Sequence, residues 1–276
     1  MVRTTPVMYG AVEDVEQLTP QLVRVILGGD GLAPFVPDEW SDSYLNLLFV
    51  PPDAPYTVPF DADGARKLDR ACWPIPRRYT VRSWDSERRR LAIEFVVHGE
   101  TGTAGRWALN AQPGDLLQFQ GPGGGYRPDP HLGWHLLVGD ESALPAIAAS
   151  LEQVPAHATA LVVGLVDGPD AELSLDCPGQ LKIIWVHRNA LPPGDSEAAG
   201  TDLVQAVAGL DFPSDGVHGF VHGEAVETRA VRRHLLGDRR MPRQALSVSP
   251  YWRRTFTDER WRSVKRDWLS EVERDV

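Results

Sequence analysis

Residues 135–153, HLLVGDESALPAIAASLEQ, decide the fold of the second half of the chain. The apolar run from His135 to Val138 predicts a buried parallel strand, and the stretch from Ala143 to Gln153 predicts the helix that follows it. Three more apolar runs and two more helical stretches come after it, at 160–166, 183–187, 219–221, 202–208 and 225–236. Gly237 is expected to end the last of these helices. Strands that alternate with helices predict an α/β domain of the nucleotide-binding type, built on a parallel sheet.

The first half of the chain follows a period of two instead, which is typical of antiparallel strands. Residues 23–27 and 91–97 alternate in this way. Three further strands are expected at 44–50, 79–83 and 116–120, each bounded by Pro, Gly or Asp. The proline-rich segment 51–76 keeps no period and predicts a long irregular excursion. Several short strands separated by turns predict a small antiparallel barrel.

The length of the chain favours two domains. Its 276 residues and 30.5 kDa exceed what one hydrophobic core usually holds. The change of pattern divides it into residues 1–131 and residues 132–276. Near its end, Trp261, Val264 and Trp268 share one face of a helix expected over 258–274, as does Val272, so this helix is expected to dock firmly.

The composition excludes several classes of partner. A formal net charge of -10 and a sequence pI near 5.3 argue against nucleic acid and anionic membranes, because both favour a basic surface. Cys72 and Cys177 form no CxxC pair, which disfavours a zinc site and a disulfide framework and fits a reducing cytosol. Residues 1–10 show neither a signal peptide nor a membrane anchor. A cytoplasmic protein without membrane insertion is therefore expected.

Residues 77–82, RRYTVR, hold the groups that a flavin dinucleotide needs. A pyrophosphate favours a bidentate cation such as Arg77, a flavin ring favours an aromatic partner such as Tyr79, and flavin N5 favours a small hydrogen-bonding group such as Thr80. In a strand Arg77 and Tyr79 share one face and Thr80 points to the other. From the spacing alone, an exposed barrel strand with solvated arginines is the stronger alternative.

Residues 98–108, HGETGTAGRWA, place glycines and small residues before a short helix. Free backbone N–H groups at such a start favour phosphate oxygens. A glycine-rich connection with Trp107 packed in the core is an equal alternative. His98 alone is more typical of a hydrogen-bonding residue at a strand end than of a ligand.

Acidic residues follow two predicted strands of the second half. Asp140 and Glu141 come before the helix that begins near Ala143, and Glu224 lies at the carboxyl edge, where open α/β sheets bind ligands. For all three acids, capping of a helix start is the simpler explanation. His131 and His135 have helical spacing but no intervening Glu, so no zinc site is predicted.

Residues 251–254, YWRR, precede the terminal helix. Aromatic rings beside cations can hold a planar flavin or an anionic, catechol-rich ligand by stacking and cation–π contact. A surface anchor for the helix is the simpler alternative.

Taken in this order, residues 77–82, 98–108, 140–146, 222–224 and 251–254 resemble the siderophore-interacting protein family, relatives of the ferredoxin-reductase superfamily, over nearly the whole chain. The resemblance implies an N-terminal antiparallel six-stranded β-barrel that binds FAD and a C-terminal α/β parallel-sheet domain that binds NADPH or NADH, with a docked C-terminal helix. It also implies a monomer that reduces ferric siderophores and holds no metal of its own.

The same resemblance supplies the candidate site residues. No residue is assigned as catalytic, because the flavin performs the chemistry. Candidates for a basic mouth that admits an anionic siderophore are Arg82, Arg253, Arg254 and Lys265. The cofactor-binding candidates are Arg77, Tyr79, Thr80, Val81, His98, Thr103, Ala104, Gly105, Arg106, Trp107, Asp140, Glu141, Ala143, Glu224, Tyr251, Trp252 and Arg253.

The chain departs from the family at the entry to its last helix. Ser249 and Pro250 precede Tyr251, and Thr255 follows Arg254, where the family commonly has glycine. The entry to this helix, and with it the placement of Arg253, is therefore expected to differ.

Three alternatives stay open. The acceptor could be ferredoxin, free flavin or a quinone on the same two domains, or the chain could be a non-catalytic siderophore-binding or iron-sensing module. The choice between NADH and NADPH is also open. Arg188, directly after the predicted strand 183–187, could meet a 2′-phosphate, but an exposed arginine is the commoner explanation there.

Overall fold

The computed structural model describes residues 7–97, 102–188, 196–213 and 215–275. The chain divides into two compact units between Gly125 and Tyr126. The change of pattern in the sequence placed the boundary after residue 131.

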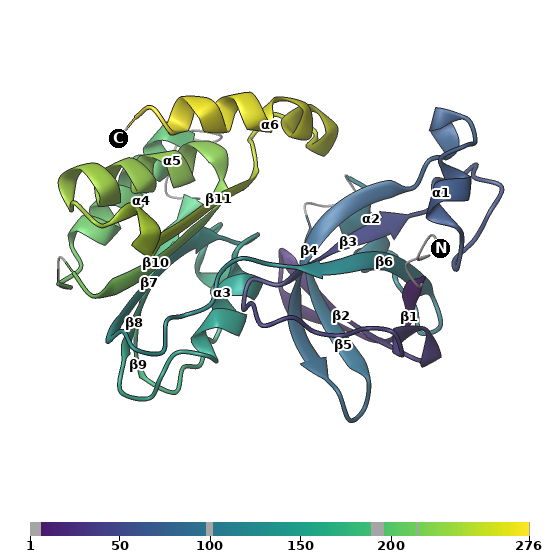
Figure 1. Ribbon diagram of the computed structural model, residues 1–276, viewed down its shortest axis with the longest axis horizontal. Helices are drawn as coiled ribbons and strands as arrows, with labels where there is room; N and C mark the ends of the chain where they lie inside the picture. Colours follow the sequence, from purple (N-terminus) through teal and green to yellow (C-terminus); the bar gives the residue numbers. More distant parts are fainter. Residues whose placement is uncertain (1–6, 98–101, 189–195, 214, 276) are drawn as a thin grey trace, which may run out of the picture. The chain divides into compact units, whose positions relative to one another are not determined.

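The first unit is a closed antiparallel barrel (Figure 1). It pairs its six strands in the order β1-β2-β5-β4-β3-β6, and β6 closes the barrel against β1. Inward side chains such as Val25, Leu45 and Ile93 are fully buried. The six strands are β1 (Met8–Thr19), β2 (Leu22–Gly28), β3 (Tyr44–Phe49), β4 (Ile75–Asp85), β5 (Arg90–Val96) and β6 (Leu116–Gly123). The barrel expected from the sequence is confirmed.

Two strands of the barrel differ from the prediction. β1 was not predicted, because Glu13, Asp14, Glu16 and Gln17 in its second half are exposed and leave no apolar period. β4 begins at Ile75 rather than Tyr79, so Arg77 lies inside the strand.

The excursion between β3 and β4 contains the short helix α1 (Ala62–Ala65) and a 3-10 turn at Arg70–Cys72. Gln118 of β6 fixes it to the barrel, because its side-chain amide accepts from the N–H of Phe60 at 2.8 Å and donates to the carbonyl of Phe60 at 2.9 Å. A second short helix, α2 (Ala104–Asn110), follows β5.

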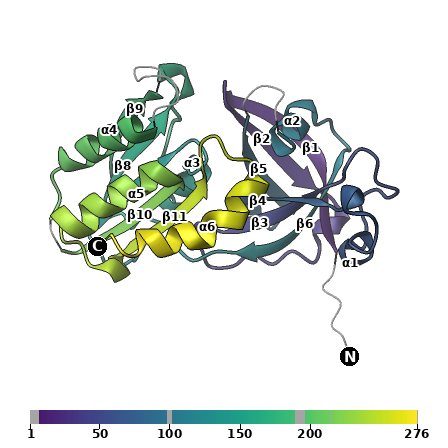
Figure 2. The same cartoon turned by 90° about the horizontal axis from the view of Figure 1, so that it is seen from above.

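The second unit is a parallel sheet covered on both faces (Figures 1 and 2). Its strands are β7 (Trp134–Asp140), β8 (Thr159–Val166), β9 (Gln180–His187), β10 (Val217–Glu224) and β11 (Leu246–Trp252), in the order β11-β10-β7-β8-β9. α3 (Leu144–Leu151) packs on the face that carries Leu137 and Val162. α4 (Ser196–Ala208) and α5 (Ala225–Arg233) pack on the opposite face. The α/β parallel sheet expected from the sequence is confirmed.

The last helix, α6 (Asp258–Val272), docks through the face that the sequence predicts. Trp261, Trp268 and Val272 are buried against Ala225 at the start of α5. Arg232 of α5 also donates a hydrogen bond to the carbonyl of Val272 at 2.9 Å. No helix in the described ranges is long and apolar enough to cross a lipid bilayer.

One prediction in this unit was wrong, and one strand was not predicted. Gly237 does not end α5, because the chain continues through a wider π-type turn, His234–Asp238, that contains it. Residues 246–252 form β11, a strand that was not predicted from the sequence. β11 tolerates Pro250 because it is an edge strand, where a missing N–H need not break a ladder.

Candidate functional site

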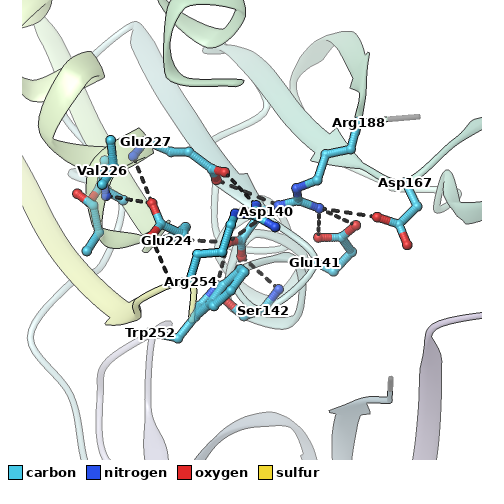
Figure 3. Close-up of polar contacts among 12 residues, drawn as sticks. Asp140, Glu141, Ser142, Asp167, Arg188, Glu224, Val226, Glu227, Trp252 and Arg254 are labelled. Carbon is cyan, nitrogen blue, oxygen red and sulfur yellow. Dashed lines mark hydrogen bonds and ion pairs between the residues drawn. The ribbon is translucent and has the colours of Figure 1, made fainter. Parts of the chain in front are cut away.

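The carboxyl ends of β7, β10 and β11 meet around the side chain of Asp140 (Figure 3). Its Oδ2 atom accepts hydrogen bonds from the backbone N–H of Glu224 at 2.8 Å and from Trp252 Nε1 at 2.7 Å. Its Oδ1 atom accepts from the N–H and the hydroxyl of Ser142 at 2.9 and 2.5 Å. One buried carboxylate therefore ties three strand ends together.

The approach of Asp140 to β10 depends on Gly223. This glycine has a φ of +139°, and a Cβ atom at its position would lie 2.8 Å from Asp140 Cγ. A side chain there would displace the carboxylate that joins the strands.

Glu224 is fully buried and caps α5. Its Oε2 atom accepts from the N–H groups of Val226 at 2.5 Å and Glu227 at 3.1 Å. Its Oε1 atom accepts from the N–H of Arg254 at 3.0 Å. The capping interpretation of Glu224 is confirmed, and the carboxylate also fixes the segment after β11.

Arg188 lies among carboxylates and is not the exposed arginine that its position suggested (Figure 3). Its Nη1 atom donates to both oxygens of Glu141 at 2.7 and 2.5 Å. Oxygens of Asp167, Glu227 and Asp140 lie 3.6, 3.6 and 3.8 Å from its Nη atoms, and its side chain is 14% exposed. In the sheet order β8 lies next to β7 and β9 follows β8, so the ends of these three strands succeed one another along the carboxyl edge, which makes this cluster possible.

The cluster around Arg188 contains more carboxyl groups than guanidinium groups. Burial raises the pKa of Glu227 to about 8, and the neighbouring Asp140 adds to this rise. Burial also raises the pKa of Glu141 to about 7, although Arg188 opposes the effect. Glu227 therefore keeps a proton at neutral pH.

In the barrel, β4 presents the residues of the RRYTVR segment on two faces. Tyr79 lies opposite Leu45 in the ladder, and its ring lies 4.5 Å from that of Phe95, so it faces the core. Thr80 lies opposite Tyr44 on the other face and is 7% exposed. Arg77 is partly buried, which differs from a fully solvated arginine. The side chain of Val81 is in the core, and its N–H donates to the carbonyl of Ser43.

The helix α2 packs against the hydrophobic core of the barrel. Ala104 and Gly105 are buried, and the ring of Trp107 lies 5.8 Å from Phe49 and 5.7 Å from Phe95. The core-packing interpretation of Trp107 is therefore confirmed. Arg106 is exposed, and Thr103 precedes the helix without a side-chain capping bond. His98 lies outside the described residues.

Two sequence profiles match the chain on the same two units. The profile of the siderophore-interacting FAD-binding domain matches residues 11–126, and that of the siderophore-interacting protein matches residues 132–255. The chain belongs to the siderophore-interacting protein family. The first match covers the barrel strands and the second covers the parallel sheet.

Two of the three relatives described below have names that call them reductases. A Mycobacterium tuberculosis protein named without a function is 41% identical over 93% of both chains. Ferric vibriobactin reductase ViuB of Vibrio cholerae is 34% identical over 88% of both chains. The NADPH-dependent ferric-chelate reductase of Escherichia coli is 28% identical over 86% of this chain and 89% of its own.

Solved structures of the family have the same architecture. The siderophore-interacting protein SipS from Aeromonas hydrophila superposes with a TM-score of 0.80, at 26% identity over 96% of this chain and 98% of its own. A siderophore utilization protein from T. fusca gives 0.76, at 34% identity over 94% and 97%. The ferredoxin reductase of carbazole 1,9a-dioxygenase gives 0.62 at 19% identity over 89% and 69%, which shows a shared fold.

β4 supplies groups of the kinds that bind the family's FAD, with the Tyr79 ring against the barrel core and Thr80 on the opposite face. Arg77 offers a guanidinium, Tyr79 a phenol and Thr80 a hydroxyl within four residues of one strand. Val81 and Ala104 have side chains in the barrel core, and Ala143 lies in the core of the second unit, so only their backbone atoms could meet a cofactor. Among the described residues, no group of three or more His, Cys, Asp or Glu side chains could hold a metal ion.

The four candidates for a basic mouth have different surroundings. Arg82 of the first unit lies 3.6 Å from the buried carboxylate of Glu94. In the second unit, Arg254 donates to Glu227 at 3.2 Å and lies over the ring of Trp252. Arg253 lies 4.8 Å from the ring of Phe256. Lys265 is half-buried on α6.

Sequence reasoning missed Glu227 and Asp167, and it gave Arg188 the wrong environment. Glu227 stands three residues after the cap Glu224, the spacing of a capping box, so a local signal was present. Asp167 directly follows β8 at the carboxyl edge. Nothing local to Arg188 indicates its pairing, because Glu141 is 47 residues away in the sequence.

Proposed function

We propose that this chain is an FAD-dependent reductase that oxidises NADPH or NADH and reduces ferric siderophores, so that iron leaves as ferrous ion. The observation that carries the proposal is the match of both family profiles, one on the barrel and one on the parallel sheet. The ferric-reductase names of relatives at 34% and 28% identity support it.

The barrel domain, taken as residues 1–131, is proposed to hold FAD. Arg77 would bind the pyrophosphate, Tyr79 would lie against the flavin and Thr80 would meet its N5 edge. The segment with His98, Thr103, Ala104, Gly105, Arg106 and Trp107 would lie along the phosphates and adenosine. FAD, when bound, takes two electrons from a nicotinamide and passes them on singly.

The second domain, taken as residues 132–276, is proposed to hold the nicotinamide cofactor at the carboxyl edge of its sheet. Asp140, Glu141, Ala143 and Glu224 form the edge, with Tyr251, Trp252 and Arg253 at the end of β11. By fixing three strand ends, Asp140 gives this edge a defined shape. The protein is proposed to act as a cytoplasmic monomer, because the cytoplasm supplies NAD(P)H.

The siderophore is proposed to be held by charge. Arg82, Arg253, Arg254 and Lys265 would offset the net charge of -10 for an anionic substrate. The chain need not ligate iron, because the siderophore does. Ferrous ion, with its lower charge, binds hard oxygen ligands more weakly than ferric ion, so reduction becomes release.

The visible spectrum of the purified protein tests the proposal. Anaerobic NADPH or NADH should bleach the flavin band, and a ferric siderophore added with a ferrous chelator should restore the band while the ferrous complex forms. A flavin that neither nucleotide bleaches would contradict NAD(P)H oxidation. Failure to take up FAD would contradict the whole proposal.

The role of the basic mouth in siderophore binding is tested by a separate experiment. Arg253→Ala and Lys265→Ala should slow flavin reoxidation by the ferric siderophore about tenfold without changing flavin content. Arg266→Ala is the matched control, because Arg266 is a cation on α6, the helix that carries Lys265, and its side chain is 94% exposed. Equal reoxidation in all these variants would exclude Arg253 and Lys265 from the substrate site.

A further inference from the structure

The order of the parallel sheet determines where each half of a dinucleotide would lie. From β7 the chain moves outward through β8 and β9 and then returns to the other side of β7 as β10 and β11. In such sheets a dinucleotide crosses the carboxyl edge at the reversal of strand order. An acid after the second strand reads the hydroxyls of the adenosine ribose, whereas a nearby arginine accommodates a 2′-phosphate.

Both types of reader are present in this chain, but their environments differ. Asp167 follows β8 and its side chain is 46% exposed. Arg188 follows β9 and its side chain is 14% exposed. Asp167 is thus half-exposed and accessible to a ligand, although its Oδ1 atom lies 3.6 Å from Arg188 Nη1, and Arg188 Nη1 is bonded to both oxygens of Glu141.

Moving the Arg188 guanidinium away from Glu141 to bind a 2′-phosphate would be unfavourable. Arg188 Nη1 donates to both oxygens of Glu141, and carboxylate oxygens of Asp167, Glu227 and Asp140 lie 3.6, 3.6 and 3.8 Å from its Nη atoms. Removing the partner of a buried charge leaves that charge without compensation. A 2′-phosphate would have to supply this free energy before it gained any contact with Arg188.

The charge of the loop that follows β8 also disfavours a 2′-phosphate. Residues 167–179, which follow β8, contain Asp167, Asp170, Glu172 and Asp176 and no Lys or Arg residue. A 2′-phosphate near this loop would be repelled. A ribose with free hydroxyls instead donates hydrogen bonds to carboxylates.

We infer that the carboxyl edge selects NADH, the donor with an unphosphorylated adenosine ribose. Asp167 accepts from the ribose hydroxyls, and Glu141 supports the choice because it already occupies Nη1 of Arg188, the guanidinium nitrogen nearest to Asp167. The inference rests on the proposed function for its electron donor, and its test is a binding measurement that needs no turnover.

The test compares ADP-ribose with 2′-phospho-ADP-ribose by calorimetric titration of the full-length holoprotein. ADP-ribose should bind at least about tenfold more tightly, which is about 1.4 kcal/mol. Asp167→Asn should weaken ADP-ribose binding by about tenfold. Glu141→Gln should reduce the preference, because Arg188 is then held by a neutral group.

Asp170→Asn is the matched control, because it removes one charge from an exposed position in the same loop as Asp167. It should leave the preference within about twofold of wild type. Equal or tighter binding of the 2′-phosphorylated probe would overturn the inference, as would the absence of binding by either probe.

The two proposals fail in different ways. If ADP-ribose keeps its preference but neither NADH nor NADPH bleaches the flavin, the reductase proposal fails and the ribose selection stands. If NADPH bleaches the flavin faster than NADH and its ribose probe binds more tightly, the reductase proposal stands and the selection of NADH is wrong.

Discussion

Asp140 and Glu227 share one buried cluster but differ in their hydrogen bonds. Asp140 accepts four, from Ser142, Glu224 and Trp252. Glu227 Oε1 accepts one from Arg254, and among the described residues none donates to its Oε2 atom, which lies 3.6 Å from Arg188 Nη2. A buried carboxyl with few hydrogen bonds favours its neutral form. Glu227 is accordingly the group in which the cluster stores a proton at neutral pH.

The proton on Glu227 makes stability depend on pH. Burial raises the pKa of Glu227 from 4.5 to about 8, so the folded protein binds a proton that the unfolded chain has released. This contribution is complete below about pH 4.5 and is lost as pH rises through about 8. Burial lowers the pKa of His135 and His222 to about 4 and 3, and these groups act in the opposite direction only below about 6.5.

Comparing the chemical unfolding of wild type and Glu227→Gln between about pH 6.5 and pH 9 separates the effect of Glu227 from that of Glu141, whose pKa of about 7 also lies in this range. Wild type should lose on the order of 2 kcal/mol over this range, and Glu227→Gln should lose clearly less. Glu271→Gln, an exposed change on α6, should keep the wild-type slope. Parallel pH profiles for wild type and Glu227→Gln would show that Glu227 is ionised in the folded protein.

At the entry to α6, Thr255 adopts a backbone conformation that usually requires glycine. Thr255 has a φ of +65°, in the left-handed region that β-branched residues avoid. Two residues later, Thr257 caps the helix, and its Oγ1 atom accepts from the N–H of Arg260 at 3.2 Å. The departure from the family at position 255 therefore strains the entry, while the helix start itself is well capped.

Thr255→Gly and Thr257→Ala should change stability in opposite directions. Glycine relieves about 1–2 kcal/mol of left-handed strain but adds about 0.5–1 kcal/mol of chain entropy, so Thr255→Gly should stabilise by about 0.5 kcal/mol. Thr257→Ala should destabilise by about 1 kcal/mol through loss of the cap. Denaturant unfolding measures both, and a destabilised Thr255→Gly variant would contradict the strain at this position.

Across the chain, the two compact units hold different groups for the proposed reaction. The barrel carries the RRYTVR strand, and the sheet carries the carboxylate edge. Each unit has its own hydrophobic core. A substitution in one unit is therefore expected to leave the folding of the other unit intact.

Arg77→Ala should separate flavin binding from folding. Loss of its guanidinium should lower the affinity for FAD by about tenfold or more, because charge-assisted bonds to phosphate are strong. Its unfolding midpoint without FAD should stay near that of wild type. Arg88→Ala, with a side chain 70% exposed in the same unit, is the control and should keep its flavin. Equal FAD content in the purified Arg77→Ala and Arg88→Ala proteins would remove Arg77 from the cofactor site.

Local pattern in the sequence was enough for the two domain types, most of the strands and the docked face of α6. Alternating residues such as Val23 and Val25 report which side chains are buried, and burial is what these patterns encode. The capping role of Glu224 was equally local, since its partners are two and three residues away. β1 was not predicted because half of it lies outside the core, and β11 was not predicted because most of its residues are only partly buried.

The environment of the candidate site was decided by tertiary structure. Asp140 meets Trp252 across 112 residues, and Arg188 meets Glu141 across 47, because the sheet order places the ends of their strands at the same edge with only one strand between them. The proton on Glu227 likewise depends on burial among groups from several strand ends. Periodicity in the sequence shows which face of a helix or strand is apolar. It does not show which charged residues, distant in the sequence, meet at the carboxyl edge of the sheet.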